Sequence, residues 1–141
     1  MSALALADTS VWGTRHLLGA AARGWFDAAV RARAIATCDQ VIAELLYSSR
    51  TVAEFRATRG RLAHIPQCSI SVAEWRRAFD VWELFAAEGG SHHRRVKFAD
   101  CLIAAAAEAA GVAVLHYDGD YDAIAAYTGQ AVRTIAPLGS L

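Results

Sequence analysis

The stretch "FADCLIAAAAEAAGVAVLHYDGDYDAIA", residues 98–125, contains the pattern that decides the fold. Its apolar, alanine-rich first half predicts a buried helix over residues 99–110 that begins at Asp100 and ends at Gly111. "VAVLHY" then predicts a buried strand, and residues 120–127 predict a short helix. A helix, a strand and a second helix in direct succession are typical of an α/β protein.

The rest of the chain continues this alternation. Short apolar runs predict strands at 3–7, 34–38 and 131–135, and helical spacing predicts helices over 11–34, 40–50, 51–63 and 72–90. The expected boundary signals are interruptions at Gly13, Gly19 and Gly24, a cap at Asp39, a capping box at Ser71 and Glu74, and a stop at Gly89-Gly90. We therefore predict a single domain over residues 1–141, with a mainly parallel sheet and helices on both faces.

Composition and charge exclude several classes of protein. With 55% hydrophobic and 20% charged residues, the chain is unlike a disordered segment.

Its longest apolar segment is broken by Asp100, Glu108 and Gly111, so we expect no membrane span. The N-terminal "MSALALADTS" contains no basic leader, and we expect a cytoplasmic protein. The cysteines and histidines do not have the spacing of a metal site. Cys38, Cys68 and Cys101 are expected to be thiols of the core, and His92 and His93 are expected to lie in a solvated loop.

A net charge of zero argues against a large basic face for nucleic acid. If four acids share one site, however, 10 acidic residues remain against 14 basic ones, and 13 of those 14 are arginine. Arginine binds two phosphate oxygens at once through its planar fork. The arginines occur in clusters that are either solvated helix faces or phosphate contacts: Arg56, Arg59 and Arg61; Arg76 and Arg77; Arg94 and Arg95.

Four acids stand in apolar surroundings, where an unpaired carboxylate costs several kcal/mol. They are Asp8 after "ALALA", Glu44 within "VIAELL", Asp100 before "CLIAAAAEAA" and Asp118 after "VAVLHY". Each aspartate alone could begin a turn or cap a helix, but a mid-helix glutamate caps nothing. On the expectation that Lys and Arg are scarce in these flanking sequences, we predict that the four acids share a bound metal ion.

The predicted topology brings these acids to one crevice. Asp8 and Asp118 follow strands, and ligands collect outside the carboxyl ends of parallel strands. Asp100 at a helix start and Glu44 one turn into a helix can reach the same place. Oxygen ligands without Cys or His select Mg²⁺ or Mn²⁺, which predicts metal-assisted hydrolysis of a phosphodiester.

The acids could also belong to two other kinds of site. Asp118, Asp120 and Asp122 match the first positions of a calcium loop, but Ala123 and Gly129 stand where that loop needs glycine and a bidentate acid. Asp122 is instead expected at the start of the short helix. A phospho-aspartate enzyme or receiver domain remains an alternative on the same fold class, although "DTS" lacks a D-x-D pair and no paired acids flank Asp8.

The chain resembles the PIN-domain ribonucleases, and among them the VapC toxins of bacterial toxin-antitoxin pairs. The resemblance rests on "ALADTSVW", "VIAELLYS" and "KFADCLIAAAAEAAGVAVLHYDGDYDAIA" in this order, and it covers nearly the whole chain. It implies a PIN-like three-layer α/β/α sandwich. Part of the family has "RDF" after the fourth acid where this chain has "GDY".

The resemblance also implies the roles of the residues. Asp8 and Asp100 would be the principal Mg²⁺ ligands, Glu44 and Asp118 would bind the metal directly or through water, and Asp120 would be an additional ligand. A hydroxyl of Thr9 or Ser10 would orient Asp8 or a phosphate. The implied function is a Mg²⁺-dependent endoribonuclease that cleaves tRNA or ribosomal RNA, forms a homodimer and is inhibited by a VapB-type antitoxin. We expect RNA contacts from Arg94 and Arg95.

Two questions stay open at this point. Trp75, Phe79 and Trp82 lie on one face of the predicted helix 72–87, where they are expected to pack in the core; the alternative is a groove for an antitoxin helix or a dimer contact. The chain could also be a non-catalytic PIN-type module that binds RNA or a partner. A pure binding module would not need the intact acidic set.

Overall fold

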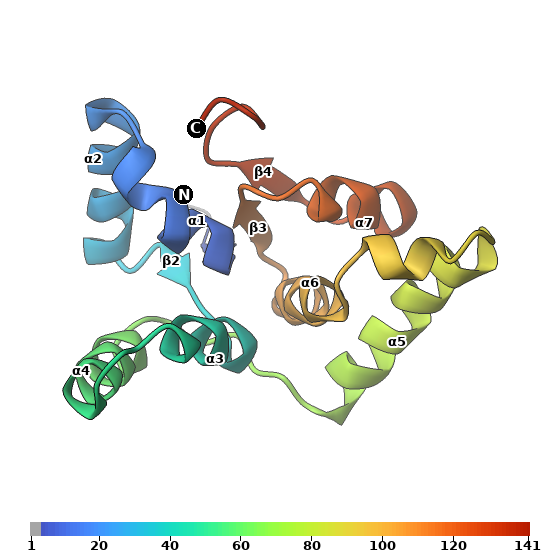
Figure 1. Ribbon diagram of the computed structural model, residues 1–141, viewed down its shortest axis with the longest axis horizontal. Helices are drawn as coiled ribbons and strands as arrows, with labels where there is room; N and C mark the ends of the chain where they lie inside the picture. Colours follow the sequence, from blue (N-terminus) through green and yellow to red (C-terminus); the bar gives the residue numbers. More distant parts are fainter. Residues whose placement is uncertain (1–3) are drawn as a thin grey trace.

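The computed structural model describes residues 4–141 and has a four-stranded, entirely parallel sheet at its centre (Figure 1). The strands are β1 (Ala5–Ala7), β2 (Ile35–Ala36), β3 (Ala113–His116) and β4 (Val132–Thr134), in the order β2-β1-β3-β4. Each lies within a predicted strand, and residue 3 of the first prediction lies outside the described residues. The parallel sheet expected from the alternating pattern is confirmed.

Helices connect and cover the strands. They are α1 (Thr9–Thr14), η1 (Arg15–Leu17), α2 (Ala20–Arg31), α3 (Asp39–Tyr47), α4 (Val52–Ala63), α5 (Val72–Ala87), η2 (His92–Arg95), α6 (Phe98–Ala110) and α7 (Asp120–Thr128). Gly19 separates η1 from α2, as predicted, but the interruptions expected at Gly13 and Gly24 are wrong. Both glycines lie on exposed helical positions, where a glycine costs only about 1 kcal/mol.

Two predicted helix starts move by one or two residues. Asp39 and Asp100 lie inside the first turns of α3 and α6, and the N-cap positions belong to Cys38 and Lys97. A carboxylate in a first turn still interacts favourably with the helix dipole. The predicted capping box of α5 is present, and the glycine stop after it is confirmed, since Gly89 and Gly90 have φ values of +81° and +61°.

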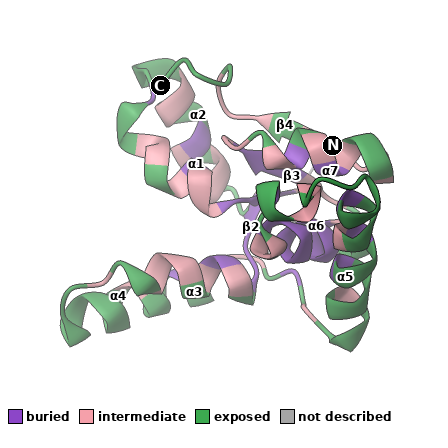
Figure 2. Cartoon of the chain, turned by 45° about the vertical axis from the view of Figure 1, so that its right-hand side comes forward, coloured by how far each residue is buried: buried purple, intermediate pink, exposed green. Residues whose placement is uncertain are grey.

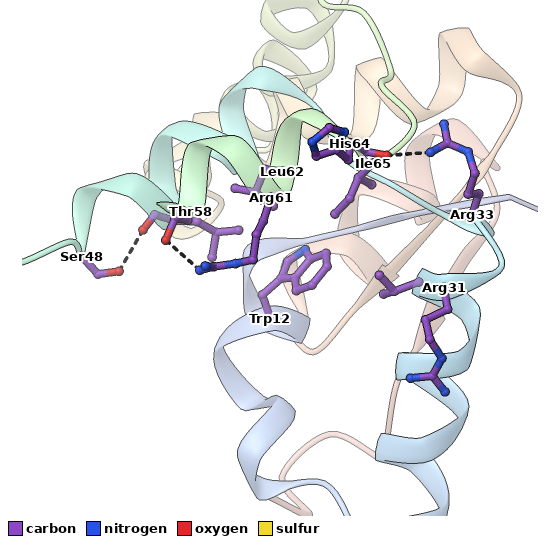
Figure 3. A pocket seen from close by; sticks show the side chains of 11 residues that line it. Trp12, Arg31, Arg33, Ser48, Thr58, Arg61, Leu62, His64 and Ile65 are labelled. Atoms are coloured by element: carbon purple, nitrogen blue, oxygen red, sulfur yellow. Dashed lines mark hydrogen bonds between the residues drawn. The ribbon is translucent and has the colours of Figure 1, made fainter. Parts of the chain in front are cut away.

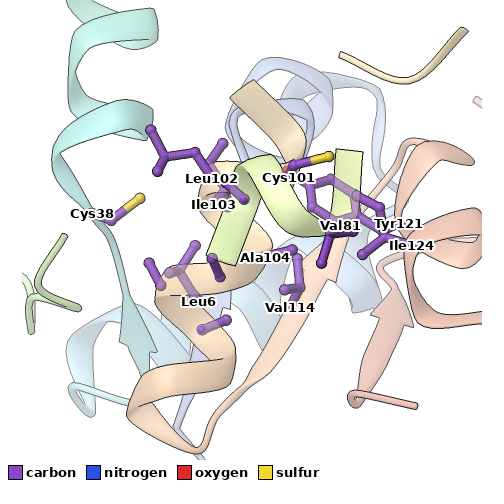
Figure 4. Packing of buried hydrophobic residues seen from close by; sticks show 14 of the residues in the cluster. Leu6, Cys38, Val81, Cys101, Leu102, Ile103, Ala104, Val114, Tyr121 and Ile124 are labelled. Carbon is purple, nitrogen blue, oxygen red and sulfur yellow. The ribbon is translucent and has the colours of Figure 1, made fainter. Parts of the chain in front are cut away.

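The sheet separates two apolar layers. Leu6 and Val114 face the layer of α5, α6 and α7, where they pack with Leu102, Ile103 and Ile124 (Figure 4). Alternate strand residues face the opposite layer of α1 and α2, because side chains alternate along a strand. Buried residues therefore concentrate on the strands and α6 (Figure 2). The result is the predicted three-layer sandwich.

The α3–α4 hairpin extends away from the sheet (Figures 1 and 2). Leu62 is the residue of α4 that is buried, and most of this helix is exposed. Within residues 4–141, no helix combines the length and apolar character that crossing a membrane requires. The three cysteines are free and buried, as expected for core thiols.

The aromatic stripe of α5 differs from its prediction. Trp75, Phe79 and Trp82 surround Phe98 at the start of α6, with ring centroids 5.7, 4.7 and 5.3 Å from it. Core packing is nevertheless the wrong description for Trp75 and Phe79, which are 44% and 45% exposed. The buried residues of α5 are Ala78, Val81 and Phe85. Because this face of the helix points to the core, Trp75 and Phe79 lie at the edge of the α5–α6 pair. A role of this face in partner binding stays a prediction.

Candidate active site

The sheet order determines where the candidate site lies. The chain leaves β1 toward β2 on one side and returns to β3 on the other side of β1, so β1 and β3 meet at the topological switch point. Ligands bind outside the carboxyl ends of strands at such a point. Asp8 directly follows β1, and Asp118 follows β3 by two residues. Both acids are therefore delivered to the same edge of the sheet.

Asp8 is buried, and hydrogen bonds fix the orientation of its carboxylate. Its Oδ2 atom accepts hydrogen bonds from the Ser10 backbone N–H at 3.0 Å and from the Ser10 hydroxyl at 2.6 Å. The Tyr117 backbone N–H donates to the same Ser10 hydroxyl oxygen at 2.9 Å, which connects it to the segment after β3. Ser10 thus orients Asp8, which is one of the two roles expected for a hydroxyl at this position.

Glu44 reaches the site from α3. Thr9 Oγ1 donates a 2.7 Å hydrogen bond to Glu44 Oε1 across 35 positions of sequence. This bond joins the first turn of α1 to the middle of α3 and restricts the carboxylate. Thr9 therefore orients Glu44, a contact that the sequence pattern did not predict.

Three further acids gather on the other side of the site. Asp100, Asp118 and Asp120 each offer a carboxylate oxygen, and these oxygens lie within 4.8 Å of one another. The Asp120 backbone N–H donates to Asp118 Oδ1 at 2.9 Å, which closes a tight turn before α7. Asp122 lies in the first turn of α7 and is exposed, as predicted.

These groups line a cavity of about 240 Å³, which we call the acidic cavity. Its lining residues are Asp8, Thr9, Ser10, Glu44, Lys97, Asp100 and Asp118. The fold therefore brings together all four acids that the sequence singled out, from segments spread over most of the chain. Asp120 belongs to the neighbouring acidic group and does not line the cavity itself.

Lys97 is a site residue that the sequence analysis missed. Its Nζ atom lies 2.8 Å from Asp118 Oδ2 and 3.7 Å from Asp100 Oδ2. The expectation that Lys and Arg are scarce near the acids is wrong here, and the i, i+3 spacing of Lys97 and Asp100 was the available signal. Burial acts to raise the pKa of Asp118, but the hydrogen bond from Lys97 and the Asp120 N–H outweigh it and lower that pKa.

The Asp100 carboxyl group is the least satisfied member of the set. It is 3% exposed, and its Oδ2 atom accepts no hydrogen bond from any residue in 4–141. Burial, then the hydrogen bond with Asp120 and the charge of Asp8, raises the pKa of Asp100 to about 9. A cation would remove this penalty, and an all-oxygen ligand set suits a hard divalent ion. The residues present therefore fit Mg²⁺ or Mn²⁺.

Tyr121 is the second site residue missed from the sequence. Its side chain is fully buried, and its hydroxyl donates to Asp8 Oδ1 at 2.6 Å and lies 3.3 Å from Asp100 Oδ1. Burial and then the charges of the two acids raise the pKa of Tyr121, so the hydroxyl stays protonated. The signal was the tyrosine of "GDY", which stands where part of the family has phenylalanine and which adds a hydrogen-bond donor between the two acids.

Arg94 and Arg95 lie in η2, and Val96 separates them from Lys97 in the chain. Both are exposed, and in the described part of the chain neither forms an ion pair with a carboxylate. They do not line the acidic cavity. The structure thus leaves them available on the surface beside it.

Comparison with known proteins agrees with this geometry. The model of the PIN domain family matches residues 5–127. The chain is 41% identical to Ribonuclease VapC18 and 36% identical to Ribonuclease VapC51, both of Mycobacterium tuberculosis. The first alignment covers 95% of this chain and 96% of the relative, and the second covers 96% of each.

A solved structure supports the fold. The DNA-bound VapBC complex of Salmonella typhimurium contains a chain that superposes with a TM-score of 0.71 at 15% identity, over 95% of this chain and 99% of that one. At this identity the likeness concerns the fold alone. Together with the family match and the two relatives, it shows that the chain belongs to the PIN-domain family and is a member of its VapC group.

Proposed function

We propose that this protein is a Mg²⁺-dependent endoribonuclease and the toxin of a type II toxin-antitoxin pair. The observation that supports this most directly is the acidic cavity at the switch point, in which the buried Asp100 has a carboxylate oxygen that accepts no hydrogen bond within residues 4–141. The VapC relatives are named ribonucleases, which supports RNA as the substrate class. The proposed targets are structured RNAs such as tRNA or ribosomal RNA.

Each residue of the acidic cavity has a proposed task. Asp8 and Asp100 would hold the metal, with Asp118 and Glu44 binding it directly or through water and Asp120 as an additional ligand. When bound, Mg²⁺ would activate water and stabilise the negative charge of the leaving oxygen. Glu44, positioned by Thr9, and Asp118, positioned by Lys97, would orient the attacking water.

RNA and an antitoxin are the proposed partners of this protein. Arg94 and Arg95, exposed beside the cavity, would contact RNA phosphates. A VapB-type antitoxin as inhibitor is supported by the structural neighbours, which are VapBC complexes. A homodimer and a cytoplasmic location remain predictions from the sequence.

The test is RNA cleavage by wild-type protein, Asp8→Asn and Asp122→Asn, in vitro with Mg²⁺ or Mn²⁺ and in cells by mapping new RNA ends after induction. Asp122→Asn is the matched control, because that acid is exposed and does not line the cavity. We expect Asp8→Asn to abolish cleavage and growth arrest while it keeps the wild-type melting temperature. Equal activity of Asp8→Asn would reject the site, and a wild-type protein that binds RNA without cleaving it would favour the non-catalytic module.

A further inference from the structure

A second, larger hollow is lined partly by the apolar side chains of Trp12, Val30, Leu45, Leu62 and Ile65, and its charged lining residues are opposite in sign to those of the acidic cavity. We call it the arginine pocket; it has a volume of about 690 Å³, and its lining includes Trp12, Arg31, Arg33, Leu45, Arg61 and His64 (Figure 3). The lining contains three arginines and no acidic residue. An anionic occupant is therefore favoured over a neutral or cationic one.

The arginine pocket follows the acidic cavity along the same two helices. Trp12 lies one turn after Thr9 on α1, and Ser48, the C-cap residue of α3, lies one turn after Glu44. One turn of a helix is about 5 Å long. A bound polymer that extends from the acidic cavity past the Thr9–Glu44 hydrogen bond would therefore next contact Trp12 and enter the arginine pocket.

The chemistry of the pocket suits a nucleotide. Trp12 Nε1 is shielded from water and donates to no group within residues 4–141; the Trp12 ring makes an edge-to-face contact with Phe26 and also lines the pocket. Arg61 lines the pocket from α4, with its guanidinium group turned to Thr58 (Figure 3). An aromatic ring beside a guanidinium group offers a stacking surface for a base and a contact for a phosphate.

The arginines keep their charge available. Arg61 donates to the Thr58 hydroxyl at 3.1 Å and Arg33 to the His64 carbonyl at 2.7 Å, both neutral acceptors. In the described part of the chain, Arg31 and Arg61 form no ion pair with a carboxylate. A phosphate would therefore meet unpaired guanidinium groups and would not have to displace an acid.

We propose that the arginine pocket binds the single-stranded RNA segment adjacent to the scissile phosphate, with one base against Trp12 and phosphates on Arg61 and Arg31. This inference rests on the proposed function in one respect, namely that the acidic cavity holds the scissile phosphate. An acidic peptide has the same charge but lacks the regular succession of flat bases and phosphates that continues directly from that cavity.

The experiment measures binding without cleavage. A fluorescently labelled 12-nucleotide RNA pool of random sequence is titrated with the full chain in EDTA, and anisotropy is recorded over a range of salt concentrations. The test variant is Arg31→Gln with Arg61→Gln. The matched control is Arg56→Gln with Arg76→Gln, which removes the same charge from exposed positions outside the pocket.

We expect the pocket pair to weaken RNA binding at least about 10-fold and to reduce the salt slope by roughly 1.4, since each phosphate contact on a single strand contributes about 0.7. The control pair should change the affinity by less than about 3-fold, within the range of unspecific surface charge effects. Trp12→Leu should weaken binding while leaving the salt slope unchanged, because it removes stacking and no charge.

Equal affinities for the two double variants would overturn the proposal. It would also be overturned if an acidic 12-residue peptide of alternating Glu and Leu, and not RNA, distinguished the pocket pair from the control pair; that result would assign the pocket to a protein partner. Because the assay contains EDTA, it is independent of catalysis. An inactive protein whose RNA affinity still depends on the pocket would remove the nuclease proposal, and with it the scissile phosphate, but would leave RNA binding by the arginine pocket in place.

Discussion

The acidic cavity and the arginine pocket occupy consecutive turns of α1 and α3, yet they carry opposite charges. The first is lined by four carboxylates and Lys97, and the second by three arginines and no acid. Lys97 already pairs with Asp118, and arginines placed among the same carboxylates would leave fewer oxygens free for a metal and fewer guanidinium groups free for a phosphate. The separation of the two hollows along two helices keeps both functions available in a chain whose net charge is zero.

The two hollows also differ in how firmly their residues are held. In the acidic cavity, Asp8 accepts three hydrogen bonds and Glu44 accepts one from Thr9. In the arginine pocket, Arg31 and Arg61 are exposed and lie on helix surfaces. A metal site needs fixed ligand geometry, whereas phosphate contacts tolerate flexible side chains. Substitutions in the acidic cavity should therefore have the larger effects.

The largest effect is expected from Asp100→Asn. It should reduce RNA cleavage by about 100-fold or more, since losing a ligand should exceed the loss of an outer partner, which costs 10–100-fold. It should also change the pH dependence of stability in the metal-free protein. Because the folded pKa of Asp100 is raised to about 9, the folded state binds an extra proton between about pH 4 and 9, and its stability falls as pH rises through that range.

The measurement is urea denaturation in EDTA at several pH values. Wild type should lose on the order of 2 kcal/mol between pH 5 and 9, and Asp100→Asn should lose less, because an amide does not titrate. Parallel pH profiles for the two proteins would show that Asp100 is ionised at low pH in the folded state, against the expectation. Asp80→Asn, whose carboxyl group is exposed on α5 and forms no hydrogen bond or ion pair within residues 4–141, serves as the control.

Lys97→Met should have the next largest effect on stability. It removes the cation beside Asp118 and Asp100, so the metal-free protein should lose about 1 kcal/mol, or roughly 3 °C in melting temperature, a modest value because the lysine is mainly exposed. Mn²⁺ should then raise the melting temperature of the variant more than that of wild type.

The control for this variant is Arg76→Met, which removes an exposed cation of α5. Differential scanning fluorimetry with EDTA and with Mn²⁺ provides all four comparisons. The idea that Lys97 stabilises the metal-free cavity fails if both variants respond to Mn²⁺ as wild type does.

Tyr121→Phe should weaken Mn²⁺ binding about 10-fold, because outer partners of metal ligands typically contribute this much. The substitution removes only the hydroxyl that bridges Asp8 and Asp100 and retains the buried ring. Isothermal titration calorimetry with Mn²⁺ measures the change. Tyr117→Phe is the matched control, since the Tyr117 hydroxyl accepts a hydrogen bond from the Leu141 backbone N–H and contacts neither acid. Identical affinities for the two variants would assign Tyr121 to packing alone.

The smallest effect is expected from Thr9→Val, which removes the hydrogen bond at the boundary between the two hollows. Glu44 keeps its charge but loses its 2.7 Å donor, so the maximal cleavage rate should fall about 5-fold, in keeping with a contribution near 1 kcal/mol. Thr14→Val is the control, because Thr14 is the last residue of α1 and its hydroxyl donates to the Ser10 carbonyl and not to Glu44. A change in the concentration of RNA needed for half-maximal rate, without a change in maximal rate, would contradict this role.

The sequence by itself was sufficient for the fold and for the acids. Apolar runs of strand length and helices of clear periodicity indicate the layers, because burial of apolar residues follows local periods of two and 3.6. Asp8, Glu44, Asp100 and Asp118 were recognisable because a carboxylate in an apolar stretch is costly and requires an explanation. The helix starts at Asp39 and Asp100 were displaced, since an acid is favourable both at a cap and in a first turn.

Only the tertiary structure decided which side chains hold those acids and what lies beside them. Tyr121 and Thr9 act across 113 and 35 positions of sequence, and Trp12, Arg31 and Arg61 form one pocket from three helices. Such contacts depend on how helices pack onto the sheet, which no local period records. Lys97 was visible in the sequence, but its partnership with Asp118 follows from the meeting of α6 and β3 at one edge of the sheet. Local patterns determine where a charge is costly, and packing determines what compensates it.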